Sequence, residues 1–161
     1  MDDKDIMKVS EPALARPLTS YADVMTYLHT IHLSPEDKRR VASRLALEVT
    51  GKNLSRTFER LDHLSSLPAG WDGYDALPLS RKVVQNLKEV LLISDDDDWK
   101  YWMISPAPNG SLSLQSKRHV ASISVGDREF SYYSSTNDGE KGESHLNFTP
   151  VALLEIMQRI V

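Results

Sequence analysis

YWMISPAPNGSLSLQSKRHVASISVGDREFSYY, residues 101–133, is the stretch of sequence that decides the fold. Apolar side chains occupy every second position in its short runs, as Ala121, Ile123 and Val125 do, and serines stand between them. Such alternation is typical of strands with one covered face and one face in solvent. Because the runs are short and their connections are tight, the stretch predicts an antiparallel meander.

Turn signals and a polar stretch set the expected limits of this sheet. The pair Asn109-Gly110 suits a turn with positive φ. Residues 138–143 (DGEKGE) predict a polar loop, and residues 145–148 predict an edge strand. The sheet is therefore expected within residues 100–148, with four to five strands.

On both sides of this sheet the apolar positions recur with the helical period of 3.6. Ser34 is a predicted N-cap, and Pro35 follows at the first helical position, where proline favours a helix start. Asn53 is the predicted cap of the next helix, and Thr149, followed by Pro150, is the predicted cap of the last one. The helices are expected at 20–32, 35–50, 54–66, 80–93 and 150–161.

Together these elements predict an α+β fold. An N-terminal helical cluster precedes the antiparallel four- to five-stranded meander, and the helices at 80–93 and 150–161 are expected to cover its apolar face. Residues 1–18 carry charges and prolines without apolar periodicity, which predicts a flexible arm. Residues 19–161 are predicted to form a single α+β domain.

The composition excludes several classes of protein. The 161-residue chain contains no cysteine, which excludes disulfides, thiolate catalysis and cysteine-based zinc sites and fits a reducing cytoplasm. No apolar run is long enough for a secretory signal or a membrane span, so a cytoplasmic protein without membrane contact is expected. The net charge of −4 disfavours a globally basic nucleic-acid binder.

Motifs for common chemistry are also missing from the sequence. It has no phosphate-binding glycine loop, no G-x-S-x-G elbow and no H-E-x-x-H zinc motif, so we expect no cofactor and no metal. His29 and His32 lie three residues apart, but no third ligand follows at short spacing. The run Asp95–Asp98 lacks the glycine and terminal acid of a calcium loop, and it is interpreted as a solvated acidic linker between a helix and a strand.

DNA binding through the helices within residues 35–66 is one alternative function. Lysine and arginine outnumber acids between residues 34 and 60, and TGKNLSRTFERL (50–61) loosely resembles a recognition helix after a glycine turn. Such a helix would turn Ser55, Arg56 and Glu59 toward the bases. The candidate DNA contacts are Lys52, Ser55, Arg56 and Arg60.

The loop GWDGYD, residues 70–75, is a candidate binding loop made of Trp71, Asp72, Tyr74 and Asp75. Its two glycines permit positive φ, and Asp72 can accept hydrogen bonds from nearby amides in an Asx turn. Trp71 is expected to plug the gap between the helical cluster and the fourth helix, with its indole N–H bonded to a carbonyl. Tyr74 is expected to act in the same way.

A catalytic interpretation of this loop makes Asp72 and Asp75 an acid and a base, which would suit a hydrolase. Paired carboxylates of this kind need a nucleophile, a further base or a phosphate cradle nearby, and the sequence supplies none. A structural corner is therefore favoured, and no residue is assigned a catalytic role.

The run LPAGWDGYDALPLS (67–80), followed by PAPNGSLSL and ASISVGDREFSYY, resembles a widespread group of small bacterial proteins, mostly uncharacterised. Its members are common in Bacteroidetes and on mobile elements, and they carry a GWDGYGA-P-S block, a P-NG-L-L turn and strand, and an ISIG…FSY hairpin. The resemblance covers roughly residues 60–135 and breaks at Asp75, where the group has Gly. It implies no catalytic residues, and the mobile-element setting implies an accessory or antitoxin-like role.

The function expected from the sequence is that of a non-enzymatic protein-interaction module. It would bind a protein partner through its sheet edge or through the surface around Trp71 and Tyr74. In its specific form the protein is the antitoxin- or immunity-like partner of a neighbouring gene product. A DNA-binding regulator and a hydrolase remain as alternatives, and the oligomeric state is left open.

Overall fold

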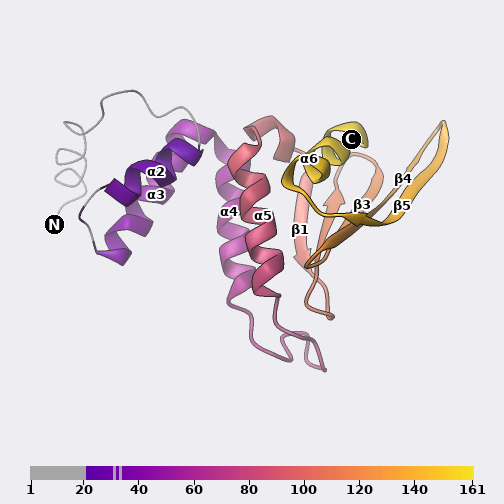
Figure 1. Cartoon of the computed structure of the whole chain (residues 1–161), viewed down its shortest axis with the longest axis horizontal. Helices are drawn as coiled ribbons and strands as arrows, with labels where there is room; N and C mark the ends of the chain where they lie inside the picture. The colour runs from indigo at the N-terminus through magenta and orange to yellow at the C-terminus, as the bar shows by residue number, and fades with distance from the viewer. Residues whose placement is uncertain (1–20, 31, 33) are drawn as a thin grey trace.

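The computed structural model describes residues 21–30, 32 and 34–161, and it confirms the α+β fold (Figure 1). Within these residues the α-helices are α2 (Tyr21–Thr30), α3 (Pro35–Thr50), α4 (Lys52–Ser65), α5 (Arg81–Ile93) and α6 (Pro150–Arg159). A 3-10 helix, η2, spans Asp96–Trp99. The strands are β1 (Trp102–Pro106), β2 (Leu112–Ser116), β3 (Val120–Val125), β4 (Glu129–Thr136) and β5 (Gly139–Asn147).

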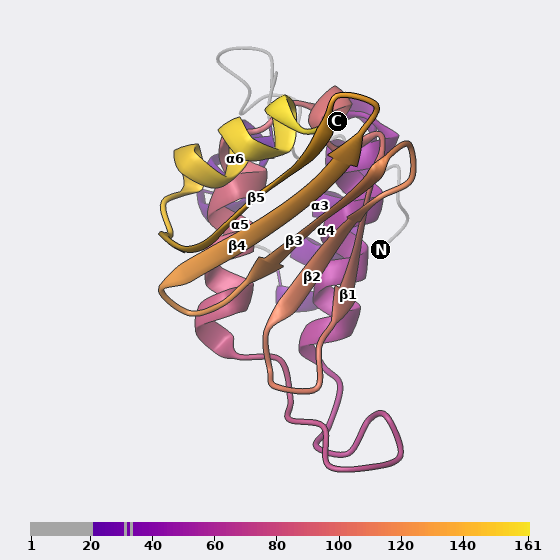
Figure 2. The ribbon, with the colours of Figure 1, turned by 90° about the vertical axis from the view of Figure 1, so that its right-hand side faces the viewer.

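The sheet is an antiparallel meander in which each strand pairs with the next one in sequence (Figure 2). Its register places Ile104, Leu114, Ile123 and Tyr132 opposite one another in a row across four strands, and all four are buried. The alternation that predicted the meander therefore marks a real inward face, because side chains of one strand parity share one side of a sheet.

The core lies between this inward face and the helices α4, α5 and α6 (Figures 1 and 2). Leu61, Leu87 and Leu153 come from these three helices and are completely buried. The prediction that the fourth and last helices cover the sheet is therefore confirmed. Helix α4 joins the same layer, whereas α2 and α3 lie at the end of the molecule away from the sheet (Figure 1).

Two predicted helix starts are confirmed in atomic detail. The Ser34 hydroxyl accepts a hydrogen bond from the Asp37 N–H at 3.2 Å, and Pro35 holds the first helical position of α3. At the start of α6, the Thr149 hydroxyl accepts from the Ala152 N–H at 3.1 Å. These caps use only local sequence, which explains why a local pattern predicted them.

The predicted start of α4 is wrong, because Asn53 lies inside the helix and Gly51 precedes it. The cap comes from far along the chain instead. One carboxylate oxygen of Asp96 accepts from the Leu54 N–H at 2.8 Å, and the other accepts from the Asn53 side-chain amide at 2.9 Å. A carboxylate at this end also complements the positive end of the helix dipole.

The interpretation of Asp95–Asp98 as a solvated linker is also wrong, because these acids form or cap η2 and two of them bond to other helices, Asp96 to α4 and Asp98 to α6. Asp95 and Asp98 form a reciprocal capping box around η2, and Gln158 of α6 donates to Asp98 at 2.9 Å. The Trp99 side chain is buried in the core, and its indole N–H donates a hydrogen bond to the Ser94 hydroxyl. The acidic run is a folded joint that ties α4 and α6 to the start of the sheet.

The predicted loop at residues 138–143 is also wrong, because β5 begins at Gly139 and extends the hairpin with β4. Nearly every side chain of β5 is exposed, so no core-facing parity was present in the sequence to reveal a strand. A bulge interrupts the pairing opposite Ser131, and His145 there has a φ of 58°.

The predicted arm at residues 1–18 lies outside the described residues, as does Ile31 within the first predicted helix. His29 and His32 are exposed, and the described part of the chain holds no group of three His, Asp or Glu side chains placed to hold a metal ion. Among the described helices, none has the length and apolar character that a membrane span requires.

Candidate functional site

The GWDGYD loop protrudes beyond the ends of α4 and α5 and is braced by its own backbone (Figure 2). The Gly70 N–H donates to the Ala76 carbonyl at 2.7 Å, and the Gly73 N–H donates to the Gly70 carbonyl at 2.9 Å. Both glycines have positive φ, 72° and 85°, as predicted from the sequence. The loop is thus a closed, internally bonded unit.

Asp72 organises the loop interior. Its Oδ1 atom accepts hydrogen bonds from the Tyr74 N–H at 2.9 Å and from the Ala76 N–H at 3.3 Å, which is the predicted Asx arrangement. Asp75 has no positive φ, since His145 is the sole described residue other than glycine with one. The backbone at Asp75 therefore does not require the Gly that the resembling group carries.

Trp71 was predicted to plug the gap between the helices, and that prediction is wrong. Its indole N–H does bond to a carbonyl, that of Leu77 at 3.0 Å, but the ring is partly exposed and lies outside the core. Because the loop projects past the helices, the indole braces the loop itself. Tyr74 does not plug the gap either, since its side chain is 84% exposed.

The base of the loop is fixed to two sheet turns. The Leu77 N–H donates to the Pro108 carbonyl at 2.8 Å, and the Ser80 N–H donates to the Gly110 carbonyl at 2.9 Å. The Ser80 hydroxyl also reaches the Asp127 carboxylate at 2.5 Å. With both its interior and its base bonded, the loop holds Tyr74 and the 56% exposed Leu77 in water.

The candidate DNA contacts are divided by the packing of α4. Lys52, Arg56 and Arg60 are exposed, but Ser55 is only 6% exposed and turned into the protein, so it cannot reach a base. The prediction for Ser55 is corrected accordingly. A recognition helix presents its N-terminal residues to the groove, whereas here the Asp96 carboxylate covers that end of the helix.

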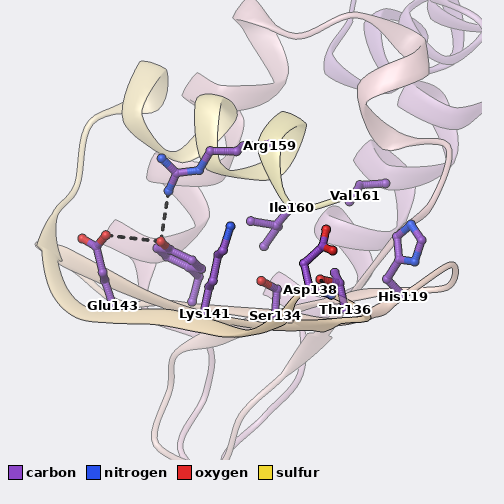
Figure 3. Close-up of a pocket in the computed structure, with 10 residues that line it drawn as sticks. His119, Ser134, Thr136, Asp138, Lys141, Glu143, Arg159, Ile160 and Val161 are labelled. Carbon is purple, nitrogen blue, oxygen red and sulfur yellow. Dashed lines mark hydrogen bonds between the residues drawn. The ribbon is translucent and has the colours of Figure 1, made fainter.

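The hydrolase alternative finds little support in the geometry. One carboxylate oxygen of Asp72 accepts hydrogen bonds from two backbone N–H groups of the loop, and Asp75 is exposed. Elsewhere in the molecule, a cavity of about 510 Å³ opens between α6 and the ends of β4 and β5 (Figure 3). It is lined by His119, Ser134 and Asp138 among others, and no hydrogen bond connects these three described side chains into the pairing of nucleophile and base that a hydrolase of this kind would use.

Instead, that cavity contains a chain of polar contacts across the edge of the core (Figure 3). Arg159 donates to the Tyr132 hydroxyl at 3.0 Å, and that hydroxyl donates to Glu143 at 3.3 Å. The Arg159 guanidinium also stacks over the Tyr132 ring, 5.6 Å from its centroid. These contacts fasten α6 to β4 and β5.

One surface was missed at the sequence level: a groove of about 390 Å³ along β1, where Arg56 and Arg60 of α4 lie beside the strand. No periodicity could reveal it, because it combines segments far apart in the chain.

Comparison of the chain with protein-family models, with curated protein sequences and with solved structures produced no match.

Proposed function

We propose that the protein is a non-enzymatic interaction module that presents the loop Gly70–Leu77 to a protein partner. The observation that carries this proposal is the exposure of Tyr74 and Leu77 on a loop whose own polar groups are already bonded internally. A loop that is rigid before binding loses little conformational entropy when it docks, and tyrosine is among the residues that most often anchor interfaces.

The available energy is large enough for a specific contact. Full burial of an apolar or aromatic side chain of this size gains about 1.5–3 kcal/mol. Because Tyr74 is 84% and Leu77 56% exposed, burying the remainder of both would supply about 2–4 kcal/mol, or roughly one and a half to three powers of ten in affinity. Asp75, exposed between them, would add polar selectivity at the rim.

In its specific form, the proposal is that the protein acts in the cytoplasm as the antitoxin- or immunity-like partner of a neighbouring gene product. Co-expression with each flanking gene product tests it, with affinity capture through this chain and a growth assay for relief of toxicity. We expect one flanking product to co-purify and its toxicity to fall. Absence of both effects for both products would refute this form of the proposal.

The loop itself is tested in the same complex. Tyr74→Ser is expected to weaken binding at least thirty-fold, the size of a typical hot spot. Val151→Ser is the matched control, because Val151 on α6 is as exposed as Leu77 and lies outside the loop. Equal effects of Tyr74→Ser and Val151→Ser would exclude the loop as the contact surface.

DNA binding stays as a second proposal because Lys52, Arg56 and Arg60 expose their charges on one helix. A gel-shift salt series on the protein's own promoter distinguishes it, since each phosphate contact steepens the dependence of affinity on salt. A flat salt dependence, or no shift, would exclude it.

A further inference from the structure

The two edges of the sheet differ in how well they are protected against pairing with another strand. The β5 edge carries the charged residues Glu140, Lys141 and Glu143, and the bulge at His145 bends it. Charges and bulges are the usual means by which proteins block strand addition. β1, with the sequence WMISP, carries no charged side chain at all.

The hydrogen-bond pattern shows which backbone groups of β1 face outward. The Lys117 N–H bonds to the Tyr101 carbonyl at 2.7 Å, and the Ala107 N–H bonds to the Ser111 carbonyl at 2.9 Å. In an antiparallel pair, bonded residues alternate with unbonded ones. The backbone N–H and C=O groups of the odd-numbered residues of β1 therefore bond to β2. Those of Trp102 and Ile104 point to the free edge.

These outward groups have no hydrogen-bonding partner within the described chain. Pro106 ends the unprotected stretch, because it has no N–H to offer an added strand. The pairing edge is thus confined to Trp102–Ser105, a length of about 10 Å at the usual rise per residue.

A groove runs along this edge. Its volume is about 390 Å³, and it is lined by Arg56, Thr57 and Arg60 of α4, by Trp102–Ser105, by Gln115 of β2 and by Lys117, which follows β2. Among the described residues no Asp or Glu lines it, although the chain as a whole has a net charge of −4. The side chains of Arg60 and Lys117 make no hydrogen bond or ion pair within the described residues.

The groove also has an apolar contact. Met103 is 48% exposed on the outer side of the strand, directly opposite Gln115 of β2. Methionine adapts its shape to irregular partners, which suits a surface that receives another chain.

We propose that this groove binds an extended, acidic segment of a protein partner, which adds to β1 as a further strand. Trp102 and Ile104 would supply two N–H donors and two C=O acceptors to the ladder, and such main-chain bonds give affinity without regard to sequence. Arg56, Arg60 and Lys117 would select acidic side chains on the added strand. The proposal goes beyond the loop function, because the groove and the loop share no residue.

Other occupants fit the groove less well. A second copy of the chain, paired β1 to β1, would bring Arg56, Arg60 and Lys117 against their own counterparts within a Debye length, where like charges repel. A nucleic acid could meet the cations, but its sugar-phosphate backbone has no alternating N–H and C=O groups to complete the ladder.

The experiment uses the full chain and a synthetic eight-residue peptide in which glutamates alternate with valines. Binding is measured by fluorescence anisotropy, and amide hydrogen exchange is followed by NMR. We expect the amides of Trp102 and Ile104 to gain protection, whereas those of Met103 and Ser105, already bonded to β2, change little. The same peptide with lysine in place of glutamate should bind at least ten-fold more weakly.

Two variants and two further probes complete the test. The double variant Arg56→Glu and Arg60→Glu should reverse the preference between the two peptides, while Arg128→Glu, on the turn between β3 and β4, should leave it unchanged. A glutamate peptide N-methylated at its pairing amides should lose at least ten-fold in affinity. The proposal is overturned if the methylated peptide binds equally well, or if Trp102 and Ile104 gain no protection. It is also overturned if a single-stranded oligonucleotide binds more tightly than the peptide, or if the chain dimerises through β1.

Discussion

Replacement of Asp96 by alanine is expected to destabilise the protein more than its place in a run of four acids suggests. The two carboxylate oxygens of Asp96 hold the Leu54 N–H at 2.8 Å and the Asn53 amide at 2.9 Å, across more than forty residues of sequence. The contact is so close that a Cβ added at Gly51 would lie 2.6 Å from the Asp96 carboxyl carbon. Gly51 brings no side chain of its own, so α4 has no local cap to take over.

The magnitude follows from these contacts. Loss of an N-cap side chain costs about 0.5–2 kcal/mol, and hydrogen bonds to a charged group are worth about 1.5–3 kcal/mol. We therefore expect Asp96→Ala to lower the free energy of unfolding by about 2 kcal/mol and the Tm by about 4–8 °C for a chain of this size. Asp96→Asn keeps an acceptor for Leu54 but loses the charge at the helix dipole, so about 1 kcal/mol is expected.

Urea denaturation followed by tryptophan fluorescence measures the effect, because Trp99 and Trp102 are both buried. Asp97→Ala is the matched control, since the Asp97 side chain lies in the same run, is exposed and makes no hydrogen bond within the described residues. The control should stay within about 0.5 kcal/mol of the parent protein. If Asp96→Ala is no less stable than Asp97→Ala, the carboxylate does not cap α4 and the reasoning fails.

Four other substitutions, at three sites, test the packing by the same measurement. Asn86→Leu should cost about 2–3 kcal/mol, because the fully buried amide donates to two carbonyls of the β3–β4 turn that would lose their partner; a neutral result would show that water replaces it. Gly110→Ala should cost about 1–2 kcal/mol, since φ is 83° and the new Cβ would lie 3.0 Å from the Pro78 carbonyl. His145→Gly should be tolerated at a φ of 58° while His145→Val costs about 1–2 kcal/mol, and equal stability of the two would contradict the strained backbone there.

The parts of the fold that the sequence predicted are those in which neighbours along the chain decide the outcome. Alternation at Ala121, Ile123 and Val125 marks a buried face because every second residue of a strand shares a side. The caps at Ser34 and Thr149 bond to amides three residues ahead, so a short pattern contains all the information. The same holds for the glycine turns and the Asx arrangement of the candidate loop.

The parts that the sequence did not predict depend on contacts between distant segments or on the absence of a core. Asp96 lies in a run that looks like solvated charge, and only the folded chain shows which of its acids meets Leu54. Only the last part of β5 was predicted as an edge strand, and its first part, within residues 138–143, was predicted as a loop, because both faces of the strand are exposed and its pattern has no period. Trp71 was expected in the core because its area is large, yet the projecting loop gives it a use within the loop itself.

The position of α4 connects the stability argument to the proposed groove. Asp96 fixes the first turn of the helix, and Arg56 and Arg60 follow one and two turns later on the side that flanks β1. The same joint leads through Trp99 into β1, so helix and strand are set against each other from one short segment. A loosened cap would therefore act on the groove before it unfolds the domain, because the first turn of a helix frays most easily. Reduced binding of the glutamate peptide by folded Asp96→Ala, with binding unchanged in Asp97→Ala, would show that the joint positions the two arginines.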